Sequence, residues 1–324
     1  MHLSYTVGAY AALARGIDAP GEDAVYGALQ ENDLVRGFEL PFRGSWTADD
    51  LAQMAKNAGP KDVVITTIPG LAGRAQDDPS FGPASPHRDG WEAALAFFQE
   101  AWRASTRLGD IIGPDRITAI VVASAPRADR PTIPQRARHL AEFLERISEW
   151  SWGATRVVLE HCDAFSEDHT MAKGFLPLEE EIAAMIGSNR DSLRPTGLSI
   201  NWGRSAIEGR GPSEATRHLN LAIQSGILYG LTFSGCSDAD TEYGPAWADV
   251  HLPPADDDGL PTYGSGSLLT PSLMNECLSQ LPERESVSVG LKVTTPNWAD
   301  VGTRIDIVSN SLQILSNAEL AKVE

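Results

Sequence analysis

Short apolar, β-branched runs alternate along the chain with longer stretches in which apolar residues recur at helical spacing. Eight runs predict strands, at Tyr5–Tyr10, Val35–Leu40, Val63–Ile68, Ile117–Ala123, Arg156–His161, Gly197–Trp202, Leu228–Ser234 and Val287–Val293. The stretches between them predict helices over Glu22–Glu31, Asp49–Lys56, Trp91–Leu108, Pro134–Trp150, Leu178–Ile186 and Ser213–Ser225, then after Pro271 and over Val301–Leu315. Eight βα units predict an α/β fold, a closed (β/α)8 TIM barrel that forms a single domain over residues 1–324.

The barrel also predicts where chemistry takes place. Active sites of such barrels lie at the carboxyl ends of the strands, in the loops that lead to the helices. Two long segments rich in Gly, Pro, Asp and Ser, residues 70–90 and residues 235–270, follow the third and seventh strands. Long loops in compact domains are commonly functional, so we expect both on the catalytic side.

Composition narrows the classes of partner. The 324 residues include 26 basic and 44 acidic side chains, a net charge of −18. Such a surface repels phosphate backbones and anionic lipid, so we expect neither a nucleic acid nor a membrane as partner. Three cysteines without CxxC spacing indicate a reducing compartment. The N-terminal residues resemble a strand more than a signal peptide, and no run reaches about 20 apolar residues, so we expect a cytoplasmic protein.

Glu160 and His161 end the fifth predicted strand. Glu160 is a candidate general base or metal ligand, and His161 a candidate proton shuttle near neutral pH. Adjacent strand residues point to opposite faces, so we expect Glu160 to point into the barrel and His161 to support it or to contact the substrate. The alternative is structural, with Glu160 bound by loop amides and His161 packed between strand and helix.

Asp249 and His251 stand two residues apart in the loop after the seventh strand. In an extended segment this spacing places both side chains on one side, where they can bind one metal together with Glu160. We therefore expect one divalent metal (Mn, Mg or Zn) or none. The alternative is that Asp249 caps a turn and His251 packs on Trp247.

Lys292 interrupts the apolar eighth strand. A lysine inside a barrel is costly unless it is paired or exposed at the carboxyl end. It is a candidate catalytic residue that stabilises an enolate, holds an anionic group or, when desolvated, acts as a base. The alternative is that its ammonium neutralises Glu160 and occupies the place of a metal.

Five further residues near strand ends are candidates for substrate binding. An amide bonds sugar hydroxyls, an indole stacks on a pyranose face, and a guanidinium clamps a carboxylate, phosphate or sulfonate. These candidates are Glu39, Asn201, Trp202, Arg204 and Trp247. Arg204 has a structural alternative, an internal salt-bridge set with Glu208 and Arg210.

Several of these motifs together resemble the xylose isomerase-like barrel superfamily, which includes sugar isomerases, ketose 3-epimerases and the endonuclease IV type of repair enzyme. The matching motifs are Phe38-Glu39-Leu40, Leu159-Glu160 and Asp249-Val250-His251-Leu252-Pro253 with Gly264-Ser265-Gly266. Val7-Gly8-Ala9-Tyr10, Glu160-His161-Cys162-Asp163 and the segment Asn201–Arg210 look like one sugar isomerase/epimerase-like family within it, a match that brings no known reaction.

The chain departs from the four-ligand metal pattern that the resemblance implies. The epimerases place Asp on strand six, His at the end of strand seven and Glu on strand eight, where this chain has Asn201, Ser234 and Lys292. Only Glu160 retains a ligand of that pattern.

The resemblance implies an enzyme that removes a proton next to the carbonyl of a sugar or keto-sugar and so isomerises or epimerises it. A first alternative is a lyase like the C-glycoside deglycosidases, whose catalytic subunit pairs with a small accessory subunit. A second is a sugar-binding barrel that has lost its metal ligands and does not catalyse. A homo-oligomer is also compatible with the sequence. DNA repair is disfavoured, because the acidic chain offers no cationic track for DNA.

Overall fold

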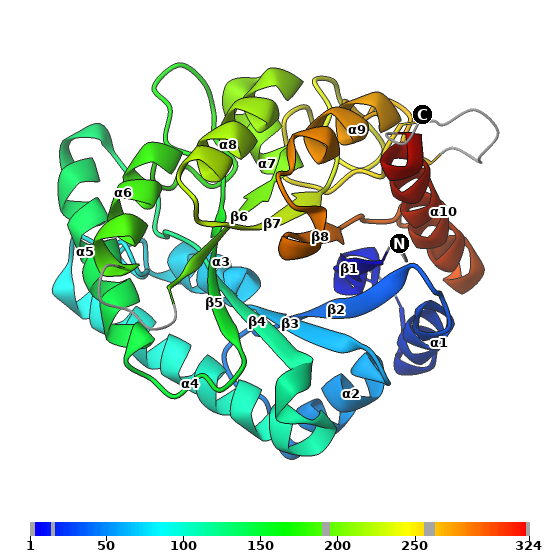
Figure 1. The fold of residues 1–324 in the computed structure, drawn as a ribbon, viewed down its shortest axis with the longest axis horizontal. Helices are drawn as coiled ribbons and strands as arrows, with labels where there is room; N and C mark the ends of the chain where they lie inside the picture. The colour runs from blue at the N-terminus through cyan, green and yellow to red at the C-terminus, as the bar shows by residue number, and fades with distance from the viewer. Residues whose placement is uncertain (1–3, 14–16, 190–194, 256–262, 322–324) are drawn as a thin grey trace. The chain divides into compact units, whose positions relative to one another are not determined.

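A computed structural model describes all residues except 1–3, 14–16, 190–194, 256–262 and 322–324. Over the described residues eight strands close into a barrel in chain order, with helices between them (Figure 1). The strands are β1 (Tyr5–Val7), β2 (Val35–Pro41), β3 (Asp62–Thr66), β4 (Ile117–Val122), β5 (Arg156–His161), β6 (Gly197–Asn201), β7 (Leu228–Phe233) and β8 (Ser288–Leu291). The predicted (β/α)8 barrel is confirmed.

Helices follow every strand in the described chain. The α-helices are α1 (Ala19–Gln30), α2 (Ala48–Ala58), α3 (Ile68–Asp77), α4 (Arg88–Ile112), α5 (Ile133–Ser148), α6 (Leu178–Asn189), α7 (Trp202–Gly209), α8 (Pro212–Gln224), α9 (Pro271–Gln280) and α10 (Val301–Leu320). Four short 3-10 helices are η1 (Ala9–Leu13), η2 (Pro114–Arg116), η3 (Arg130–Thr132) and η4 (Arg284–Ser286). None of the helices in the described ranges has both the length and the apolar character needed to cross a bilayer.

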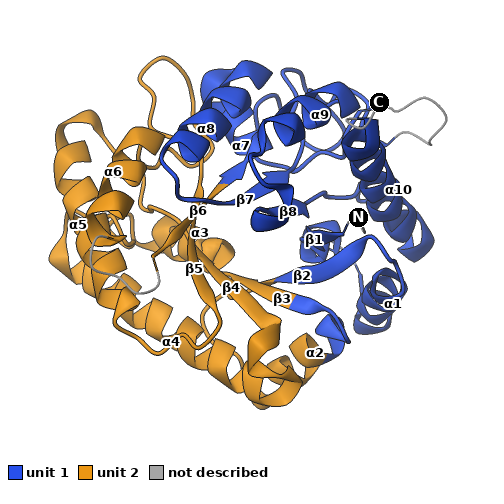
Figure 2. Cartoon of the chain, viewed as in Figure 1, with its two compact units in different colours: residues 1–39, 56–62, 200–324 blue, residues 40–55, 63–199 orange. Residues whose placement is uncertain are grey.

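The chain forms two compact units (Figure 2). Unit 1 comprises residues 1–39, 56–62 and 200–324, and unit 2 comprises residues 40–55 and 63–199. Both units contain parallel strands followed by helices. The single-domain organisation over residues 1–324 stays a prediction.

Strand pairing in unit 1 depends on a small residue. Thr6 of β1 pairs with Gly37 of β2 on one side and with Gly290 of β8 on the other. A Cβ on Gly37 would lie 2.8 Å from the carbonyl oxygen of Asp62, so only glycine allows this approach. Together with the pairing of β7 with β8, these contacts hold β1, β7, β8 and β2 as far as Glu39 relative to one another in this unit.

Unit 2 is held by β-branched strands and an aromatic cluster. β3, β4 and β5 pair in parallel, and their apolar side chains are buried. Phe98 of α4 lies 5.8 Å from Phe143 of α5 and 6.0 Å from Trp152, between ring centroids. These rings pack α4, α5 and the segment before β5 against one another.

Two helices were not predicted from the sequence. Residues 70–77, predicted as loop, belong to α3, which begins with Pro69 in its first turn, a favoured place for proline. Trp202, predicted to end a strand, begins α7, which Asn201 caps. The loop after β7 is described over 235–255 and 263–270; the remaining residues of the predicted loop lie outside the described residues.

Candidate active site

Lys292, Glu39 and Tyr10 form a buried polar cluster in unit 1. The Lys292 ammonium donates to Glu39 Oε1 at 2.9 Å, and the Tyr10 hydroxyl donates to the same oxygen at 3.1 Å. The Lys292 and Glu39 side chains are only 2% and 8% exposed. Burial, and then the Glu39 charge, raise the pKa of Tyr10 above its usual range, so the phenol keeps its proton. Within unit 1 the carboxylate that bonds Lys292 is Glu39, and the association of Lys292 with Glu160 stays a prediction.

The backbone provides room for the Lys292 side chain. A Cβ on Gly8, directly after β1, would lie 2.8 Å from Lys292 Cγ. The Lys292 backbone N–H donates to Phe233 O at 2.9 Å, which continues the pairing of β7 with β8. The ammonium also lies 4.8 Å from the centre of the Tyr10 ring. The cluster thus presents one cation, one carboxylate and one phenol in a dry environment, where a charge on a ligand is strongly felt.

Arg204, Asp249 and His251 form a second cluster in unit 1. Arg204 Nε lies 3.2 Å from Asp249 Oδ2, and His251 Nδ1 lies 3.3 Å from Asp249 Oδ1. The Arg204 and Asp249 side chains are 3% and 7% exposed. Asp249 and His251 therefore lie beside each other, although the left-handed backbone of His251 departs from the extended segment that the prediction assumed. Both carboxylate oxygens of Asp249 already face a protein cation or imidazole, which weakens Asp249 as a metal ligand.

The segment that carries Asp249 is fixed by backbone contacts. His251 has a left-handed backbone, with φ of 56°, and its carbonyl accepts from Thr294 N at 2.8 Å. Leu252 and Gly235 exchange two backbone hydrogen bonds of 2.8 Å. A Cβ on Gly264 would lie 1.9 Å from Pro254 O, so this glycine of the Gly-x-Gly stretch serves close backbone packing.

Asn201 and Trp202 have structural roles here. Asn201 Oδ1 caps α7 by accepting from Arg204 N at 3.3 Å, and it also accepts from Ser234 Oγ at 2.8 Å. Trp202 is completely buried in the first turn of α7, so its indole is part of the core and offers no face to a sugar. Trp247 is half-buried and lies against the Arg210 guanidinium, 5.0 Å from the ring centre.

In unit 2, the contacts of His161 determine the direction of Glu160. His161 is fully buried, and its Nδ1 lies 2.7 Å from Glu181 Oε2 of α6. The other Glu181 oxygen accepts from the Ser124 hydroxyl, just after β4. Because His161 faces the helices, Glu160 faces the opposite side of β5, which is the barrel interior. Glu160 is 3% exposed.

Comparison with known proteins places the chain in a family. A family model described as "Domain of unknown function (DUF4862)" matches residues 6–307. The chain belongs to this DUF4862 family. It is also similar to the Salmonella typhimurium (strain LT2) protein described as "Uncharacterized protein STM3670", with 29% identity over 293 residues that cover 90% of this chain and 89% of that protein.

Solved structures share the barrel fold of this DUF4862 member. A putative xylose isomerase from Rhodospirillum rubrum superposes with a TM-score of 0.63 at 10% identity, covering 98% of this chain and 99% of that one. A D-allulose 3-epimerase from Methylomonas sp. in complex with D-allulose gives 0.57 at 14%, covering 98% and 97%. An IolI protein with a bound zinc atom gives 0.55 at 10%, covering 100% and 98%. At these identities the likeness establishes the fold, which is the barrel that the resemblance implied.

The metal pattern of the superfamily does not fit unit 1 of this DUF4862 chain. Asn201 is neutral, and its oxygen is bonded to Arg204 N and to Ser234. Lys292, in the place of the strand-eight Glu, carries an ammonium group, which repels a cation and has no lone pair to donate. Three of the four ligand positions therefore hold groups that suit hydrogen bonding among themselves or to a substrate.

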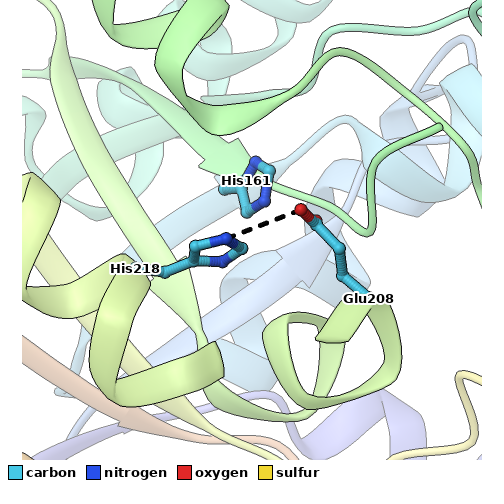
Figure 3. A group of neighbouring side chains, drawn as sticks. All are labelled: His161, Glu208 and His218. Atoms are coloured by element: carbon cyan, nitrogen blue, oxygen red, sulfur yellow. Dashed lines mark ion pairs between the residues drawn. The ribbon is translucent and has the colours of Figure 1, made fainter. Parts of the chain in front are cut away.

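Figure 3 draws three side chains of a metal-binding type: His218 and Glu208 from unit 1, and His161 from unit 2. Within unit 1, His218 Nε2 lies 3.5 Å from Glu208 and 3.0 Å from Glu214. The Arg217 guanidinium lies 3.0 Å from the same nitrogen, and His218 Nδ1 lies 2.9 Å from Ser205 Oγ. His218 is thus embedded in protein contacts that a metal would have to displace.

Sequence reasoning did not find Glu181, Ser124 or His218. Glu181 stands in an acidic first helical turn, the usual place for a carboxylate near a helix N-terminus, so nothing in the pattern marked it as the partner of His161. The one signal was indirect: a histidine that ends a buried strand needs a polar partner on the following helix.

The contact between Glu214 and His218 predicts that the free energy of unfolding of this DUF4862 protein falls at acid pH. The hydrogen bond with His218 lowers the pKa of Glu214 to about 2, despite partial burial that raises it. The depressed pKa means that this stabilisation is full above the usual value of 4.5 and is lost as the pH falls towards 2. We expect Glu214→Gln to lower the free energy of unfolding by about 1–2 kcal/mol at pH 7.

The difference between Glu214→Gln and wild type should shrink when urea unfolding is repeated at successively lower pH between 5 and 3. Glu92→Gln, at an exposed ion pair with Arg88, is the matched control and should change stability little at any of these pH values. If Glu214→Gln lowered the free energy of unfolding by the same amount at every pH, the lowered pKa of Glu214 would be contradicted.

Proposed function

We propose that this chain is an enzyme that isomerises or epimerises a sugar or keto-sugar by removing a proton from the carbon next to its carbonyl. The observation that carries the proposal is the buried cluster of Lys292, Glu39 and Tyr10. A buried ammonium held beside a carboxylate is expensive to maintain, and such groups concentrate at functional sites. The barrels to which the chain is similar include an epimerase in complex with D-allulose.

We assign residue roles from the general rule that active sites of such barrels lie at the carboxyl ends of the strands, and Glu160 and Lys292 each stand at such an end. Glu160 is the base that takes the proton. The C–H electron pair forms the C=C bond of an enediolate, and the Lys292 ammonium stabilises the oxygen that becomes negative. Delivery of a proton from solvent to the other face gives the epimer, and return of the proton from Glu160 to the neighbouring carbon gives the isomer.

Other predicted residues support this step. His161, held by Glu181, packs behind β5 and positions the strand end that bears Glu160. Glu39 fixes the Lys292 ammonium and is available to bond a sugar hydroxyl, as are Arg204 and Trp247 near the loop after β7. Lys292 supplies the positive charge that a divalent ion supplies in metal-dependent barrels, so the reaction needs no metal at this position.

The test is hydrogen exchange with solvent. Purified chain is incubated in D2O with a panel of ketoses and aldoses, and deuterium at the carbon next to the carbonyl is measured by NMR and mass spectrometry. We expect deuterium in both the recovered substrate and its epimer or isomer, and no loss of exchange after dialysis against EDTA. Loss on dialysis with recovery by Mn, Mg or Zn would show a metal site instead, for which Glu160, Asp249 and His251 are the candidates.

The same experiment separates the two alternatives. An elimination product in place of an epimer would identify a lyase, and light scattering of the sample would then look for a small accessory subunit or a homo-oligomer. Sugar binding without any exchange would identify a non-catalytic barrel. We further propose that the protein acts in the cytoplasm, since its three cysteines show no CxxC spacing and cannot all pair in disulfides.

A further inference from the structure

A cavity of about 300 Å³ opens in unit 2, on the side where the strands end. It lies among α3, which follows β3, and the segments that follow β4 and β5. Its walls include Ala75 and Gln76 of α3, Pro126 and Phe175. This volume is at the small end of the range for ligand sites, and it suits one polar head group with part of a sugar.

The two charged residues that line the cavity are both cations, Arg127 and Lys173. None of the described residues lining it is acidic, although the whole chain has a net charge of −18. Arg130, which is not part of the lining, forms an ion pair of 2.8 Å with Glu167. A local excess of positive charge on an acidic protein attracts anions specifically to that place.

The guanidinium of Arg127 is held in place without being neutralised. Its Nη2 donates to Met171 O at 3.0 Å and its Nε to Lys173 O at 3.4 Å, and both acceptors are uncharged carbonyls. Gly174, with φ of 70°, makes this approach possible, since a Cβ there would lie 3.3 Å from Arg127 Cγ. A planar guanidinium fixed in this way is suited to bind a phosphate or carboxylate through two parallel hydrogen bonds.

The segment that carries Lys173 is fixed by a buried carboxylate. Asp163, which is fully buried, accepts from the Lys173 backbone N–H at 3.0 and 2.8 Å and from Gly174 N at 3.3 Å. Leu176 N donates to Ser124 Oγ at 3.3 Å, and Ser124 also bonds Glu181, the partner of His161. The cavity wall and the residue behind Glu160 therefore share one hydrogen-bond network.

We infer that this cavity binds the anionic group, a phosphate or a carboxylate, of the sugar on which the enzyme acts. The inference rests on the proposed function for the sugar part of the ligand. Arg127 and Lys173 bind the anionic group, and Gln76 lies within the same cavity to bond a hydroxyl. The preferred substrates are then sugar phosphates or sugar acids, and neutral sugars bind more weakly.

Calorimetric titration of the full chain tests this with matched ligands: D-fructose 6-phosphate against D-fructose, and D-glucuronate against D-glucose. We expect at least one anionic sugar to bind at least 10-fold more tightly than its neutral counterpart. The double variant Arg127→Gln/Lys173→Gln should reduce that preference to threefold or less. Ala75→Trp, which fills the cavity but keeps both charges, should weaken the anionic sugar similarly. Arg130→Gln, at the neutralised surface pair, should leave the preference unchanged.

Circular dichroism and thermal unfolding establish that each variant is folded. Equal affinity for charged and neutral partners in the wild type, or a preference that survives in the double variant, would overturn the inference. The pair that shows the preference identifies phosphate or carboxylate as the group. Calorimetry measures binding without turnover, so the two hypotheses can fail separately. A preference for anionic sugars without deuterium exchange would contradict only the proposed function. Deuterium exchange on neutral sugars without a preference for anionic ones would contradict only the inference about the cavity.

Discussion

Lys292→Met is expected to lower the free energy of unfolding by about 3–5 kcal/mol. Methionine keeps most of the volume of the lysine stem beside Gly8 but removes the ammonium that bonds Glu39. The Glu39 carboxylate then remains 8% exposed without its cation, and an unpaired buried charge is strongly destabilising. Urea unfolding at pH 7 measures the change.

A double-mutant cycle identifies the cause. Because Glu39→Gln removes the negative charge, Glu39→Gln/Lys292→Met should be more stable than Lys292→Met alone, although it has one more substitution. Lys56→Met is the matched control, since Lys56 pairs with Asp23 at 2.6 Å with 61% of its side chain exposed, and it should cost no more than about 1 kcal/mol. A Lys292→Met effect as small as that of Lys56→Met would show that the cluster is well hydrated.

Glu160→Gln should slow exchange of the substrate proton with solvent by about 10²–10⁴-fold. Glutamine has the same shape as glutamate at this 3%-exposed position but cannot take a proton. Because the size and shape of the side chain and one accepting oxygen are kept, affinity for the sugar should change only a few-fold. The measurement compares deuterium incorporation rates and calorimetric affinities of variant and wild type on the same sugar.

Glu180→Gln is the control, because Glu180 is a neighbouring carboxylate on α6 whose charge is in solvent contact. Its exchange rate should match that of wild type. If Glu160→Gln kept a third or more of the rate, Glu160 would not be the base, and His161→Gln would test the other candidate on β5. If Glu160→Gln lost affinity for the sugar as well as its exchange rate, Glu160 would instead be assigned to substrate binding.

The barrel was predictable because one pattern, an apolar run followed by a helical stretch, is repeated along the chain. Eight apolar runs with helical stretches between them leave few alternatives, and each run was found close to where a strand lies. The errors were at strand ends: Trp202 and residues 70–77 are helical. Hydrophobic periodicity cannot separate the last residues of a buried strand from the first turn of a buried helix, whereas Asn201 and Pro69 marked both starts.

The candidate residues were predictable by type but not by partner. Polar residues at strand ends and in the loop after β7 predicted a polar function for Glu160, His161, Lys292 and Asp249. Asp249 and His251 could be paired from the sequence because two residues of separation fix their relative direction locally.

Sequence alone thus determined the (β/α)8 fold, the end of the barrel where polar groups gather, and the departure from the superfamily's metal ligands. Only the tertiary structure decided that Lys292 bonds Glu39, 253 residues away in the chain, that His161 faces Glu181, and that Arg127 and Lys173 line one cavity. Periodicity reports which face of an element is buried, since burial repeats along the chain. It carries no information on which of many distant polar groups meets another, because that depends on strand register and loop path in three dimensions.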